Sequence, residues 1–168
     1  VEQYPALIYW RGIRNQSALA KVRRAFVHFD HSFKQILVLF RVDLNGFTVS
    51  YDSSYTLKLA NECTLLLTDS GINTPGTLQS TAPDCAAIIF DGSASVLTIE
   101  KITVSGIAKA IMLTYNGTIT EASLLVKSGT LIGGDNAIDT LGASVVLEGG
   151  NLQGGPSGDI YWESGSVD

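Results

Sequence analysis

One short tripeptide recurs through the C-terminal half of this chain. Alanine or glycine, then serine, then an aliphatic residue stand together at Ala94-Ser95-Val96, Ala122-Ser123-Leu124, Ala143-Ser144-Val145 and Gly165-Ser166-Val167. Successive copies are separated by roughly 21 to 28 residues, and a period in the range of about 20 to 50 residues is typical of proteins built from stacked units. The repeat therefore predicts a solenoid before any single element is assigned.

Each of the first three copies extends over twelve residues that alternate as a strand, a polar turn, a second strand and a glycine. An apolar pair stands before each of these copies and a related pair before the fourth: Ala87-Ile88, Ala110-Ile111, Ala137-Ile138 and Asp159-Ile160. These pairs keep a period similar to that of the tripeptide. Two or three short strands per period, closed by turns, fit one coil of a β-solenoid. We therefore expect an all-β fold.

The composition agrees with one folded domain. The 168 residues are 45% hydrophobic and 16% charged, which is enough apolar material for a continuous core. The longest apolar run, over residues 35–40, is far too short to cross a bilayer, so we expect no membrane insertion.

Charge divides the chain into two parts. Residues 1–41 hold seven basic and two acidic residues, whereas residues 42–168 hold four lysines and fourteen carboxylates. Within the basic segment, Leu19, Val22 and Phe26 recur on one side of a predicted helix over residues 15–26. We interpret residues 1–41 as a basic N-terminal segment whose amphipathic helix caps the first coil of a solenoid over residues 42–168. Basic residues confined to one short segment do not indicate nucleic-acid binding.

Two strand motifs carry a resemblance to a known group. Val42-Asp43-Leu44-Asn45-Gly46-Phe47-Thr48-Val49 and Leu65-Leu66-Leu67-Thr68-Asp69-Ser70-Gly71, followed by repeats that end in Ser-Gly-Thr or Gly-Gly, resemble secreted bacterial β-helix proteins of the pectate-lyase-like type. Related coils occur in phage tailspikes. The resemblance implies a right-handed parallel β-helix, here of about five to six coils, at an extracellular, cell-surface or virion-surface location. Proteins of this group include adhesive, carbohydrate-binding and lyase members.

The two cysteines are separated by about one period of the repeat. Cys63 and Cys85 would lie in neighbouring coils at this spacing, and stacked strands are about 4.8 Å apart, within the range that a disulfide accepts. One interpretation places the two thiols one above the other, bonded in an oxidising compartment. The other interpretation is two unrelated buried thiols.

Three kinds of residue are candidates for a ligand site. Asp135 and Asp139, in a glycine-rich turn with Asn136, could hold calcium, although a simple polar corner fits the missing ligand spacing better. Tyr115, Tyr161 and Trp162 could offer aromatic faces to sugar rings. Lyases of the resembling group combine calcium-binding carboxylates with an arginine or lysine base. The predicted solenoid contains no arginine, so an enzyme acting on polysaccharide is the least favoured function.

We expect a non-catalytic structural or adhesive β-helix module, with a carbohydrate-binding module of the same fold as the alternative. The fourth tripeptide stops two residues into a strand, and an open coil is a template for another strand. The predicted partners are therefore a second copy, stacked head to tail, or the rest of a longer parent chain, with polysaccharide as a further candidate ligand.

Overall fold

The computed structural model describes residues 8–10, 39–52, 54–60, 63–91, 94–113, 122–163 and 166–168. Every regular element in these ranges is a β-strand. The described part of the chain therefore contains no helix that is long and apolar enough to cross a membrane. The helix predicted over residues 15–26 lies outside the described residues.

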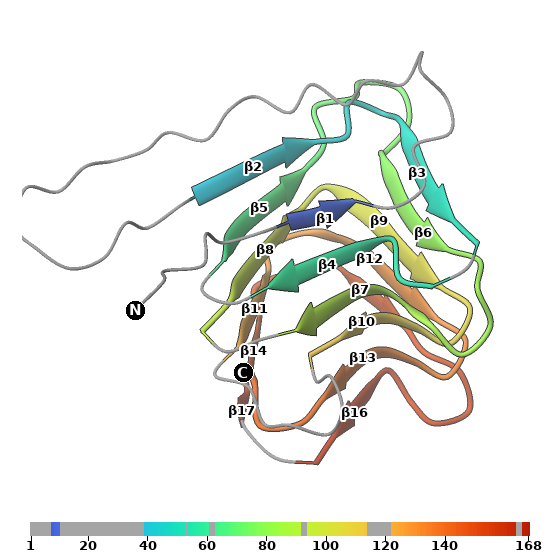
Figure 1. The fold of residues 1–168 in the computed structure, drawn as a ribbon, viewed down its shortest axis with the longest axis vertical. Coiled ribbons are helices and arrows are strands. Elements are labelled where there is room, and N and C mark those ends of the chain that lie inside the picture. Colours follow the sequence, from blue (N-terminus) through green and yellow to red (C-terminus); the bar gives the residue numbers. More distant parts are fainter. Residues whose placement is uncertain are drawn as a thin grey trace, which may run out of the picture.

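Fifteen of the strands form five coils of three strands each (Figure 1). The coils comprise β2 (Leu39–Asp43), β3 (Thr48–Tyr51) and β4 (Leu57–Ala60); β5 (Thr64–Thr68), β6 (Thr77–Ser80) and β7 (Ala86–Asp91); β8 (Val96–Glu100), β9 (Ile102–Gly106) and β10 (Lys109–Met112); β11 (Ser123–Val126), β12 (Gly129–Gly133) and β13 (Asn136–Thr140); and β14 (Ser144–Leu147), β15 (Asn151–Gln153) and β16 (Ile160–Trp162). A short strand, β17 (Ser166–Val167), follows them, and β1 (Ile8–Trp10) lies antiparallel to β4. The predicted all-β stack of parallel strands is confirmed.

Stacking of the coils generates three sheets. Sheet 1 has the order β17-β14-β11-β8-β5-β2, sheet 2 has the order β15-β12-β9-β6-β3, and sheet 3 has the order β1-β4-β7-β10-β13-β16. All pairs except β1–β4 are parallel, as expected when each strand repeats one coil later (Figure 1).

Aliphatic side chains fill the space between the sheets in vertical rows. In sheet 1, Leu65, Leu97, Leu124 and Val145 are aligned and buried. Sheet 2 contributes a second buried row and sheet 3 a third: Leu78, Val104 and Leu131, and Ile88, Ile111 and Ile138. Alternate residues of each strand face inward, so the period-two pattern of the sequence becomes one continuous core.

The strand register corrects the repeat alignment at one coil. Matching the tripeptides places Ser95 opposite Ser123, whereas the structure pairs Val96 with Ser123, so the true repeat is one residue shorter here. The difference arises because the inward residues must align: Leu97 faces the core directly above Leu124. Ala94 has a φ of 57°, which marks the irregular turn where the extra residue is absorbed.

Glycine is required at the corner between sheets 2 and 3. Gly106 and Gly133 are paired in register, and each ends its strand where the chain bends sharply toward the next sheet. A Cβ atom at Gly133 would overlap the carbonyl oxygen of Asn136, and one at Gly106 would overlap that of Lys109. The close approach of the backbone at this corner therefore explains Gly106, which ends the first sequence repeat, and Gly133, which stands one residue before the end of the second.

Candidate functional site

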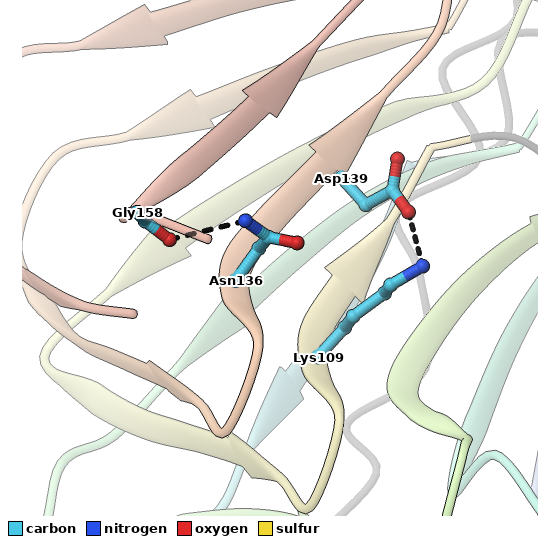
Figure 2. Close-up of polar contacts among 4 residues, drawn as sticks. All are labelled: Lys109, Asn136, Asp139 and Gly158. Carbon is cyan, nitrogen blue, oxygen red and sulfur yellow. Dashed lines mark hydrogen bonds and ion pairs between the residues drawn. The ribbon is translucent and has the colours of Figure 1, made fainter. Parts of the chain in front are cut away.

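The polar cluster with the most specific geometry lies on sheet 3, across strands β10 and β13. Lys109, at the start of β10, donates a hydrogen bond from Nζ to Oδ2 of Asp139 on β13 (Figure 2). The side chain of Lys109 is 27% exposed and that of Asp139 only 13% exposed. Lys109 pairs in register with Asn136, three residues before Asp139, so its side chain must extend along the sheet to reach the carboxylate.

Further hydrogen bonds beside this ion pair hold the corner that precedes β16. Asn136 is buried, and its Nδ2 donates to the carbonyl oxygen of Gly158 at 3.1 Å (Figure 2). The carbonyl oxygen of Asp159 accepts from the backbone N–H groups of Ala137 and Ile138. These bonds hold the corner that leads into β16, and therefore the aromatic residues on that strand.

The structure separates the aromatic residues predicted to bind sugar. Tyr161 pairs with Asp139 and is 48% exposed, whereas Trp162 pairs with the buried Thr140 and is 55% exposed. Neighbouring residues of a strand point to opposite faces, so the two rings cannot form one platform. Tyr161 shares the row of Asp139, while Trp162 shares that of Ile160, which packs against the core. Tyr115 lies outside the described residues.

The two carboxylates predicted to bind calcium do not converge. Asp135 is exposed at the corner before β13, and Asp139 lies four residues later, about 13 Å along the strand. Asp139 already faces the Lys109 ammonium group. Among the described residues, no three His, Cys, Asp or Glu side chains are grouped where they could hold a metal ion.

The stacking expected for the cysteines is wrong, because both occur in the second coil on different sides of it. Cys63 precedes β5 in sheet 1 and Cys85 precedes β7 in sheet 3, and both thiols are free. The residue above Cys63 is Ser95, whose Oγ accepts from the Cys63 backbone N–H at 3.4 Å. Burial raises the pKa of the Cys63 thiol to about 11. A spacing of one coil length does not ensure stacking when loop lengths differ between coils.

A second polar cluster occupies the corner between sheets 1 and 2 in the first two coils. Oδ1 of Asp43 accepts from the backbone N–H groups of Asn45 and Ser70, at 3.0 and 2.9 Å. Oδ1 of Asp69, which is buried, accepts from the backbone N–H of Gly46 at 2.6 Å. Partial burial acts to raise the pKa of Asp43, but hydrogen bonds from Ser70 and Asn45 and the charge of Arg41 prevail, so this pKa is lowered. The two carboxylates thus tie the corners of successive coils together.

Beside this corner, residues 69–76 form a loop next to a shallow open groove of about 330 Å³. Ile72 in this loop is 97% exposed. The hydrogen bonds of Asp43 and Asp69 to Asn45, Gly46 and Ser70 close this corner, so these residues of the two sequence motifs have an architectural role.

No sequence motif marks Lys109, and Asn136 stood out in the sequence only as a possible calcium ligand beside Asp135 and Asp139. The pairing partner Asp139 is 30 residues away from Lys109, and no local pattern connects the two. Only the coil length, once known, brings β10 and β13 side by side.

Comparison with protein-family models, with curated proteins and with solved structures finds no match to this chain. The surfaces of the coils are therefore the features of this protein that bear on its function.

Proposed function

We propose that this chain is a non-catalytic β-helix module with a structural or adhesive role in an extracellular, cell-surface or virion-surface protein. The observation that carries the proposal is the unbroken stacking of five coils into three sheets of matched strands. Such a stack presents long, flat and rigid surfaces, which suit repeated contacts with an extended or repetitive partner. This architecture by itself specifies no reaction, so the proposal concerns contact and support.

Self-association through the fifth coil is part of this proposal. Leu147, Leu152 and Ile160 are only partly buried, and Trp162 is 55% exposed. The residues one coil earlier, such as Leu131 and Ile138, are fully buried. A second copy, or a further segment of a longer parent chain, stacked on this coil would cover the apolar side chains and pair with the outer edges of β15 and β16, which end their sheets among the described strands.

Light scattering over a range of protein concentrations tests the self-association. We expect a mass that rises with concentration, and we expect Trp162→Ser to weaken this rise. Ile72→Ser, which removes a large and more exposed apolar side chain from the second coil, is the matched control. A mass that stays at one chain at the highest concentrations would refute the head-to-tail contact.

Carbohydrate binding on sheet 3 is the second candidate function. Tyr161 stands directly beside Asp139, and the Lys109–Asp139 pair supplies both a donor and an acceptor next to the ring. Sugars combine apolar ring faces with hydroxyl groups, which match an aromatic side chain flanked by polar groups. A glycan array probed with the chain and with Tyr161→Ala tests this candidate, and equal binding by both proteins would exclude Tyr161.

A further inference from the structure

Sheet 2 bears two rows of outward-facing residues, in register on all five strands. The first row is Thr48, Thr77, Thr103, Thr130 and Asn151. The second row, two residues later on each strand, is Ser50, Gln79, Ser105, Ile132 and Gln153. Nine of these ten side chains carry a hydroxyl or an amide group, and none carries a charge. All ten are exposed or partly exposed.

The array is rigid because the residues between the two rows belong to the core. Val49, Leu78, Val104 and Leu131 face inward and are buried. Neighbouring positions within a row are therefore held about 4.8 Å apart, and the two rows about 6.7 Å apart. Each strand of sheet 2, with its two outward residues, forms one rung of this array. One hydrogen bond already joins two neighbouring rungs, since Nε2 of Gln79 donates to Oγ of Ser50 at 3.1 Å.

The chemistry of this face favours a neutral ligand rich in hydroxyl groups. A hydroxyl group both donates and accepts a hydrogen bond, and an amide does both through separate atoms. An ionic ligand would find no opposite charge in these two rows, although the chain as a whole carries a net charge of −5. An extended β-1,4-linked glycan advances by one sugar over a distance close to the strand spacing, so one sugar can face each rung.

We propose that the outer face of sheet 2 binds an extended neutral polysaccharide that runs parallel to the axis of the coils. This inference depends on the adhesive role proposed above and names the ligand class and the face. Five rungs span about 19 Å, which accommodates four to five sugars. Each hydrogen bond at an exposed face contributes little net free energy, so binding depends on the simultaneous contact of several rungs.

Two other occupants of a flat hydroxyl-bearing face are disfavoured by the second row. An ice surface requires side chains of uniform height, but this row mixes Ser105, Ile132 and Gln153, whose lengths differ. A second copy docked face to face would bury nine polar side chains against the same set. A flexible glycan tolerates side chains of unequal length, because its hydroxyl groups can meet them at different depths.

The test replaces three hydroxyl groups and preserves the shape of the strands. Thr77→Val, Thr103→Val and Thr130→Val are combined in one variant, since valine is isosteric with threonine and equally compatible with a strand. The matched control carries Thr64→Val and Thr98→Val, at partly exposed positions of sheet 1. Thermal unfolding of both variants confirms that each is folded.

Binding is measured by co-sedimentation with insoluble cellulose and chitin, and by titration with soluble cello- and chito-oligosaccharides of two to six sugars. We expect the native chain to bind one of these polymers, with affinity for the oligosaccharides levelling off at four to five sugars. The triple variant should bind at least about tenfold more weakly, since three hydrogen bonds are removed, and the control should differ by less than about twofold.

Three results would overturn the inference. Unchanged binding in the triple variant, with loss in Tyr161→Ala, would assign glycan binding to sheet 3 and leave the adhesive function intact. Absence of binding to both polymers would refute the ligand class, while the self-association measurement would still decide the structural role. Inhibition of ice recrystallisation by the native chain, lost in the triple variant, would assign the face to ice.

Discussion

Two adjacent leucines on β11 provide a direct test of the core and its register. Leu124 is 1% exposed and stacks in register between Leu97 and Val145, which are both fully buried. Leu125 follows it on the same strand, is only partly buried, and faces outward between Thr98 and Val146. Leu124→Ala and Leu125→Ala thus make the same chemical change in the same strand, on opposite faces of the sheet.

The expected magnitudes differ because only one site is enclosed. Leu124→Ala removes three buried carbon groups, which costs about 2.4 kcal/mol at roughly 0.8 kcal/mol each. Its neighbours in the coils above and below are held by their own strands and cannot fill the space, so the cavity raises the loss to about 3–4 kcal/mol. Leu125→Ala opens no cavity and removes partly solvated atoms, so we expect about 1 kcal/mol or less.

Urea unfolding followed by far-ultraviolet circular dichroism measures both free energies of unfolding. We expect the midpoint for Leu124→Ala to fall well below that for Leu125→Ala. Equal losses, or a larger loss for Leu125→Ala, would refute the register. In the alignment of the sequence repeats, Leu125 and not Leu124 stands opposite the core residue Leu97, so the comparison separates the two registers.

Three further predictions concern polar groups. Lys109→Met should lower the free energy of unfolding by about 1–2 kcal/mol, because it leaves the largely buried Asp139 carboxylate without its cation, as urea titration would measure. Because the pKa of Asp43 is lowered by folding, its carboxylate stabilises the fold above the pKa of the unfolded chain, and this contribution is lost as the pH falls through the pKa of the folded chain. Asp43→Asn should therefore lose less stability than the native chain on acidification from pH 5 to below the ordinary value of 3.8. Iodoacetamide at pH 8 should modify Cys85 and spare Cys63, whose pKa is raised to about 11 by burial, as peptide mass spectrometry would show.

Each of these predictions has a control within the chain. The Lys127–Glu100 pair is more exposed, at 44% and 30%, so Lys127→Met should cost less than about 0.5 kcal/mol. A pH profile of Asp43→Asn identical to that of the native chain would show that this carboxyl does not contribute. Alkylation in urea should modify both cysteines at similar rates, and equal rates in the folded chain would contradict the burial of Cys63.

The sequence predicted the pairings within sheet 3 correctly. The apolar pairs placed Ile88, Ile111, Ile138 and Ile160 at successive coils, and the register aligns all four. Hydrophobic residues at these positions must face one interior, so their spacing reports the coil length directly. The tripeptide repeat was wrong by one residue at Ser95, because the buried Leu97 and Leu124 set the register of these strands and the two serines do not.

The candidate site was only partly predictable. Tyr161 and Asp139 were each singled out from sequence for different ligands, but their adjacency on β13 and β16 follows only from the stacking. For Cys63 and Cys85 the spacing was misleading, because the second coil is longer than the 22 residues between them: Thr64 pairs with Val96, 32 residues later.

The sequence alone determined that this chain stacks short strands, because a period-two pattern of aliphatic residues that returns once per coil can bury its apolar side chains only against neighbouring repeats. Tertiary structure decided which outward residues meet. Residues that face outward need not be apolar, so the sequence pattern does not predict that one row is formed by Thr48, Thr77, Thr103 and Thr130. Loops of unequal length make the intervals between these threonines irregular along the chain, and only the closed coils bring them into line.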